Sequence, residues 1–115
     1  MKSGMHRERL PKKRQSEIYE VGMEGYEVIV TLGKYEDGSY GEMFVDLGKE
    51  GSDVSGWANA FAMAFSLGLQ HGIPPDKLIG TFGGMKFGHR GKTDYNGYEA
   101  TNVPDLIMQI MDKEG

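Results

Sequence analysis

The chain has 115 residues, no cysteine and a formal net charge of -4, with 17 Asp and Glu residues against 13 Lys and Arg residues. This length fits one small domain that buries a single core, and the lack of cysteine excludes disulfides, thiolate metal sites and a thiol nucleophile. No signal-peptide pattern is visible and no apolar run approaches the roughly 20 residues of a membrane helix, so we expect a cytoplasmic protein without a membrane partner.

Basic residues gather at the N-terminus. Residues 1–14 hold six of the Lys and Arg residues and a single acid, Glu8, while the remainder of the chain is acidic. Such an arm can bind phosphates or nucleic acid, and the alternative is a solvated, partly disordered tail. We therefore expect a basic arm over residues 1–14 and one domain over residues 15–115. The candidate contacts in the arm are Arg7, Arg9, Lys12, Lys13 and Arg14.

Alternating apolar residues predict three strands, over residues 16–21, 26–32 and 41–47. Asp37-Gly38 is typical of a hairpin turn between the second and third strands. In the third strand, Glu42 and Asp46 are expected to face solvent, and alternation alone explains them without a catalytic role. The strands should form an antiparallel meander, whose two open edges favour pairing with a second copy in a homo-oligomer.

The apolar spacing then changes to that of helices. A long helix is expected from Ser52 or Asp53 to about Gln70, followed by shorter helices over residues 75–82 and from Thr101 or Asn102 to about residue 111. Strands followed by helices indicate an α+β fold with the helices packed on one sheet face. In the long helix, one row is expected to face the core and a second row of small residues to pack closely against the sheet or a partner helix. These rows are Val54, Trp57, Phe61, Phe65 and Leu69, and Gly56, Ala60, Ala64 and Gly68.

No pattern in the sequence predicts an enzyme. His6, His71 and His89 are scattered without metal-ligand spacing, and no serine has a histidine and a carboxylate nearby in sequence. We therefore expect no catalytic residue, no metal and no cofactor in this chain.

A glycine-rich loop over residues 83–93 ends in Gly-Lys-Thr, as a phosphate-binding P-loop does. The P-loop pattern requires a glycine where Lys86 stands and a helix after Thr93, but a turn follows instead. The loop nevertheless brings cations and flexible backbone together, which suits a phosphate, and its alternative is a solvated surface loop. Its candidate ligand contacts are Lys86, His89, Arg90, Lys92 and Thr93.

Two further pairs of residues extend this candidate site. Ser52 and Ser55 open the long helix, whose free N–H groups could meet a phosphate, although a plain helix cap explains them too. Tyr95 and Tyr98 could stack on a base or pack as lids of their own loop.

Several short motifs occur in an order that is typical of one known family. They are Arg9-Leu10-Pro11 with Arg14, Tyr35-Glu36-Asp37-Gly38, Gly41-Glu42-Met43-Phe44, Lys49-Glu50-Gly51-Ser52, Ser66-Leu67-Gly68-Leu69-Gln70-His71-Gly72-Ile73-Pro74, and Lys86-Phe87 before Gly91. Together, over about residues 7–111, they resemble the TSCPD domain at the C-terminus of adenosylcobalamin-dependent (class II) ribonucleotide reductases.

The resemblance implies a domain that accompanies a reductase, but not reductase chemistry in this chain. The family's reaction uses cysteines on a separate large barrel, and this sequence has neither; His89 also stands where the family commonly has proline. The main hypothesis is a non-catalytic module that binds a nucleotide, cyclic nucleotide or other phosphate ligand, as in a phage-type sequestering protein. The alternatives are an accessory or split subunit that joins a reductase large subunit, and a nucleic-acid-binding oligomer, which the acidic body disfavours.

Overall fold

The structure is a computed structural model that describes residues 6–23, 25–48, 52–87 and 90–115. It confirms the α+β class: three strands come first and a long helix and two shorter helices follow. Two short strands, one at the end of the glycine loop and one after it, were not expected. The elements are β1 (Ser16–Met23), β2 (Tyr26–Lys34), β3 (Tyr40–Asp46), α1 (Ser52–Gln70), α2 (Pro75–Phe82), β4 (Gly91–Lys92), β5 (Glu99–Ala100) and α3 (Val103–Glu114).

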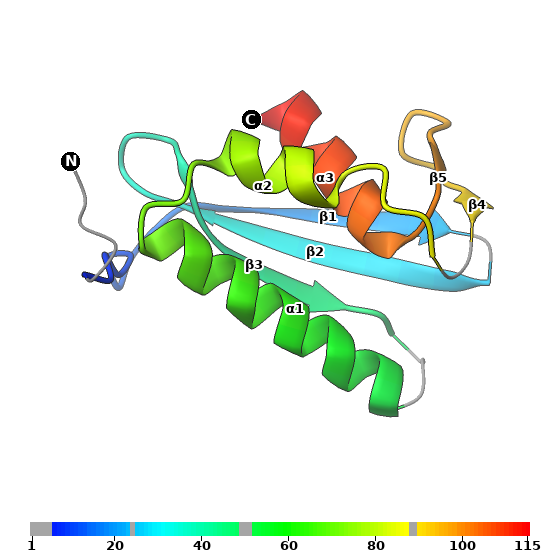
Figure 1. Cartoon of the computed structure of the whole chain (residues 1–115), viewed down its shortest axis with the longest axis horizontal. Helices are drawn as coiled ribbons and strands as arrows, with labels where there is room; N and C mark the ends of the chain where they lie inside the picture. The colour runs from blue at the N-terminus through cyan, green and yellow to red at the C-terminus, as the bar shows by residue number, and fades with distance from the viewer. Residues whose placement is uncertain (1–5, 24, 49–51, 88–89) are drawn as a thin grey trace.

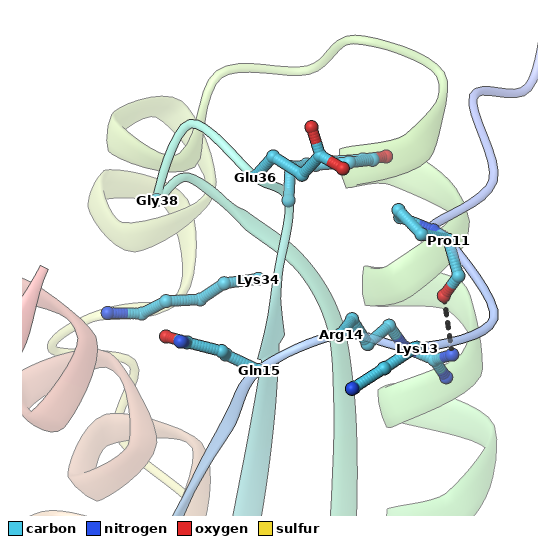
Figure 2. Close-up of a pocket in the computed structure, with 8 residues that line it drawn as sticks. Pro11, Lys13, Arg14, Gln15, Lys34, Glu36 and Gly38 are labelled. Carbon is cyan, nitrogen blue, oxygen red and sulfur yellow. Dashed lines mark hydrogen bonds between the residues drawn. The ribbon is translucent and has the colours of Figure 1, made fainter.

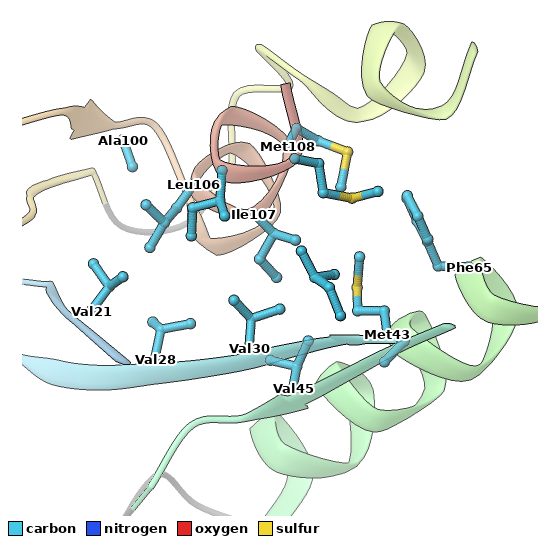
Figure 3. Close-up of a cluster of buried hydrophobic side chains, with 14 of the residues drawn as sticks. Val21, Val28, Val30, Met43, Val45, Phe65, Ala100, Leu106, Ile107 and Met108 are labelled. Carbon is cyan, nitrogen blue, oxygen red and sulfur yellow. The ribbon is translucent and has the colours of Figure 1, made fainter. Parts of the chain in front are cut away.

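The predicted meander is confirmed, with antiparallel strands in the order β1-β2-β3. Val28, Val30 and Leu32 alternate along β2 and are fully buried on one face. α3 lies over this face and points Leu106 and Ile107 at the strands (Figure 3). The core therefore lies between the sheet and α3, and this fixes the position of the N-terminal end of α3.

The long helix α1 runs alongside β3 (Figure 1). The Ser66 hydroxyl accepts the backbone N–H of Met43 at 2.8 Å and lies 3.2 Å from its carbonyl oxygen, and Gln70 Nε2 donates to the carbonyl of Gly41 at 2.9 Å. These side chains satisfy backbone groups on the outer edge of β3. The sequence suggested that this edge is open, but α1 covers it. The other edge, at β1, is bound at one end, where Gly22 and Asp94 exchange hydrogen bonds. The homo-oligomer thus stays a prediction, but open sheet edges no longer support it.

The burial expected for α1 is correct only at its C-terminal end. Phe65 and Leu69 are buried, but Val54 and Trp57 are 47% and 78% exposed. The small residues Gly56, Ala60 and Ala64 are also exposed, so they do not pack against the sheet. The reason is that α1 lies beside the sheet, where only a narrow strip of the helix is covered, and helical spacing does not reveal how wide the covered strip is.

The described part of the arm, residues 6–14, contacts the domain. The backbone N–H of Glu8 donates to the carbonyl of Gln70 at 2.8 Å, and Arg7 Nε bonds to the side-chain oxygen of Gln70. Arg14 forms a salt bridge with Glu42, including a 3.0 Å bond to Oε1. The expectation that Glu42 faces solvent is therefore wrong, because the arm covers it and leaves it only 8% exposed.

Candidate functional site

The start of the glycine loop is tied to the N-terminal end of α3. The backbone N–H of Gly84 donates to Asp105 Oδ1 at 3.1 Å. The carbonyl of Met85 accepts from Thr101 Oγ1 at 3.0 Å and from the side-chain amide of Asn102. Gly84 has φ +80°, a conformation that glycine adopts without strain. Lys86 therefore leaves the core from an anchored point.

Asp105 holds this junction together. It is 5% exposed and also accepts the Tyr98 hydroxyl at 2.7 Å and the backbone N–H of Thr101 at 3.0 Å. Burial alone would raise the pKa of Asp105, but the hydrogen bonds from Thr101, Tyr98 and Gly84 outweigh burial and lower it. Asn102 accepts the backbone N–H of Asp105 at 2.8 Å, so of the two predicted candidates, Thr101 and Asn102, it is Asn102 that caps α3. The carboxylate is thus an anionic anchor with all of its bonds inside the protein.

Two of the predicted cations share one surface depression. Lys86 and Arg90 line a hollow of about 350 Å³ together with Phe87 and Thr101. No carboxylate is among the described residues that line it. Arg presents planar, bidentate donors to a phosphate and Lys a mobile point charge, so this hollow can hold an anion.

The other predicted loop residues are placed differently. Lys92 is exposed on β4 and does not line the hollow. Thr93 is 7% exposed, and its hydroxyl donates to the carbonyl of Tyr98 at 2.7 Å, so it serves the loop. His89 lies outside the described residues.

Tyr95 and Tyr98 pack within their own part of the chain. Tyr95 donates to Glu114 at 2.7 Å, and its ring meets that of Tyr19 edge-on at 6.5 Å. Tyr98 donates to Asp105. Burial raises the pKa of both hydroxyls to about 12. This arrangement agrees with the alternative in which the two rings serve as lids; base stacking on them stays a prediction.

The beginning of α1 lies close to the glycine loop, which the sequence did not predict. Val54 and Trp57, near Ser52 and Ser55, line an apolar groove of about 410 Å³, and Phe87 of the glycine loop lines it as well. Ser55 is half-buried, and the side chain of Ser52 is not described. Phe87 thus belongs to both the groove and the cationic hollow. The sequence did contain an indication that part of α1 is an exposed apolar surface. The helix has 19 residues, and Asp53 is the only charged residue among them.

A second hollow contains the arm cations Lys13 and Arg14 with Lys34 of β2 (Figure 2). Two of its cations already have partners: Arg14 binds Glu42, and Lys34 Nζ lies 3.0 Å from a carboxylate oxygen of Glu17. Glu36 lines the same hollow. It is therefore a poorer anion site than the hollow at the glycine loop. The other arm cations, Arg9 and Lys12, are exposed.

Within the part of the chain that the structure describes, no group of three or more His, Asp or Glu residues could hold a metal ion. Among the same residues, no helix has the length and apolar character needed to cross a membrane.

Comparison with known proteins gives a consistent result. A family model described as the TSCPD domain matches residues 4–114. Vitamin B12-dependent ribonucleotide reductases from Bradyrhizobium diazoefficiens and Rhodopirellula baltica are 34% and 38% identical over 105 and 104 residues. These matches cover 90% of this chain but only 8% and 10% of the two relatives, so the chain spans about a tenth of their length or less. No solved structure matches the chain.

Proposed function

Because the chain belongs to the TSCPD domain family, we propose that it is a non-catalytic module that binds a phosphate-bearing ligand such as a nucleotide. The observation that supports this most is the hollow in which Lys86 and Arg90 lie together without a described carboxylate. The reductase activity named for the relatives belongs to proteins about ten times longer. We place no reaction in this chain.

The anchoring of the loop makes the site more than a pair of surface cations. Gly84 and Met85 are bonded to Asp105, Thr101 and Asn102, and Thr101 itself lines the hollow. A fixed loop start lowers the entropy that Lys86 loses when it contacts a ligand. Since the whole chain has a net charge of -4, the attraction is local, and added salt should weaken binding.

Isothermal titration calorimetry with tripolyphosphate, nucleotides and cyclic nucleotides tests the proposal. The Lys86→Ala/Arg90→Ala double variant should lose about tenfold or more in affinity, since each charged contact contributes about 1.5–3 kcal/mol. Lys77→Ala removes an exposed lysine of α2 and is the matched control. The proposal would be contradicted if none of the phosphate compounds bound, or if the double variant kept full affinity. A sequestering role further requires that a bound nucleotide is recovered unchanged.

A second candidate is an accessory or split subunit of a B12-dependent ribonucleotide reductase. The exposed side of α1 favours it: Trp57, Met63 and Leu67 are 78%, 67% and 41% exposed on a helix with one charge. Apolar surface of this kind is typical of protein interfaces. Co-purification with a reductase large subunit, lost in Met63→Glu, would support it. The nucleic-acid alternative is weaker, because Arg7 and Arg14 of the basic arm are bonded within the domain.

A further inference from the structure

The apolar groove between α1 and α3 lies directly beside the cationic hollow. Ten apolar residues that line it come from four segments, which are the end of β3, α1, the glycine loop and the start of α3. The groove volume of about 410 Å³ lies in the range of small-molecule sites, about 300–1,000 Å³. Among them are Val54, Trp57, Phe61, Phe87, Val103 and Ile107.

We infer that this groove binds the ring system of the phosphate ligand, so that one nucleotide occupies both the groove and the hollow that Lys86 and Arg90 line. The inference rests on the proposed function for its phosphate half. Phe87 lines both the groove and the hollow that contains Lys86 and Arg90, so a molecule in contact with one can reach the other. A ligand with a flat apolar group at one end and an anion at the other matches this distribution of surfaces.

Two aromatic side chains of the groove are open to a ligand. Trp57 is 78% exposed and Phe87 is 52% exposed. Stacking on such side chains contributes about 1–3 kcal/mol per base in single-strand-binding proteins and tolerates any base, because every base has a π-face. The floor of the groove is fixed, since Ile107 is buried in the core and the Phe61 ring contacts that of Phe82 at 5.3 Å.

The groove offers no described side-chain partner for the edge of a base. Asn102 is the only polar residue among the described residues that line it, and both ends of its amide are occupied. The oxygen accepts the backbone N–H of Asp105 at 2.8 Å, and the nitrogen donates to the carbonyl of Met85 and to Thr101 Oγ1, the latter at 3.3 Å. Apolar sites discriminate weakly between similar ligands, whereas sites that hydrogen-bond a group reject analogues that lack it. Adenine and guanine nucleotides should therefore bind almost equally.

Trp57 is the only tryptophan, so intrinsic fluorescence reports on the groove directly. We expect ATP and GTP to quench this emission with dissociation constants within about threefold of each other. By calorimetry, tripolyphosphate should bind about tenfold more weakly than either nucleotide, because it cannot stack.

Substitutions separate the two halves of the site. In Trp57→Ala, ATP affinity should fall about tenfold, to that of tripolyphosphate, while tripolyphosphate affinity stays unchanged. Trp57→Phe should restore most of the loss, and Met63→Ala, an exposed apolar change on the same helix outside the groove, should alter neither affinity. Far-UV circular dichroism and urea midpoints verify that the variants are folded.

Three results would overturn the inference and leave the phosphate site standing. They are equal affinities for tripolyphosphate and ATP, unchanged ATP affinity in Trp57→Ala, and a more than about tenfold preference between ATP and GTP. Trp57 emission that shifts with protein concentration in the absence of ligand would also overturn it, because a second copy would then cover the groove. ATP affinity that is unaffected by Lys86→Ala/Arg90→Ala would instead contradict the proposed function.

Discussion

The backbone N–H of Gly84 donates to the carboxylate of Asp105, 21 positions further along the chain, at 3.1 Å. This bond joins the first residues of the glycine loop to the first turn of α3. Asp105 also accepts bonds from Tyr98 and Thr101, so one side chain connects the segments on both sides of the candidate phosphate site. The position of Lys86 therefore depends on a buried carboxylate that does not itself line the hollow.

Replacing Asp105 with Asn should destabilise the domain and weaken phosphate binding together. The amide would present an N–H group to at least one of the donors Gly84, Tyr98 and Thr101, leaving it unsatisfied at a cost of about 1–3 kcal/mol. Urea unfolding measures the first effect and calorimetry with tripolyphosphate the second. Asp112→Asn, an exposed change in the same helix, is the control. Unchanged stability in Asp105→Asn would show that the junction is not held by this carboxylate.

Stability should fall on acidification, with Asp105 among the groups responsible. Burial alone would raise its pKa, but its hydrogen bonds lower it overall, and a hydrogen bond from Lys34 lowers the pKa of Glu17. A carboxyl with a lowered pKa in the folded state stabilises the fold above the unfolded pKa, about 4, and this contribution is lost as the pH falls through the folded pKa. Urea midpoints should thus decline below about pH 4, and less steeply in Asp105→Asn. Equal slopes in the two proteins would refute the assignment to Asp105.

Loss of the hydroxyl should change the free energy of unfolding in opposite directions at Tyr40 and at Tyr35. Tyr40 is 6% exposed and its hydroxyl has no hydrogen-bond partner among the described residues, whereas Tyr35 donates to the carbonyl of Glu8 at 2.6 Å. Tyr40→Phe removes a desolvated group and should raise the free energy of unfolding by about 1 kcal/mol, while Tyr35→Phe should lower it by a similar amount. Chemical denaturation of both variants measures this. A loss of stability in Tyr40→Phe would mean that its hydroxyl is satisfied.

Ser66→Ala tests how α1 is held beside the sheet. The substitution leaves the N–H of Met43 on the edge of β3 without the Ser66 oxygen and should cost about 1–3 kcal/mol. Asn59→Ala is the matched control, an exposed change on the same helix that should stay within about 0.5 kcal/mol. Equal urea midpoints for the two variants would argue that apolar packing alone positions α1.

The sequence allowed prediction of elements whose pattern is local. Alternation predicted the strand over residues 26–32, whose Val28, Val30 and Leu32 are buried, and Asn102 was one of two predicted caps of α3. Contacts between distant residues could not be predicted in this way. Arg14 and Glu42 are 28 positions apart, and their salt bridge reverses the expected exposure of Glu42.

The same limit applies to the candidate site. Lys86 and Arg90 were identified because cations and glycines are adjacent in sequence, and the structure places both on one hollow. The contribution of Trp57 was missed, because helical spacing assigned it to the core although it is 78% exposed. Its proximity to Phe87 follows from the position of α1 beside β3, which depends on polar bonds such as that between Ser66 and Met43.

Phosphate binding at Lys86 and Arg90 can be mapped residue by residue in an NMR titration of the backbone amides with tripolyphosphate. We expect the largest chemical-shift changes at Lys86, Phe87 and Arg90 and at the N-terminal end of α3, with smaller changes elsewhere. Changes concentrated instead at Lys13, Arg14 and Lys34, in the hollow beside the arm, would contradict it, as would the absence of any saturable change.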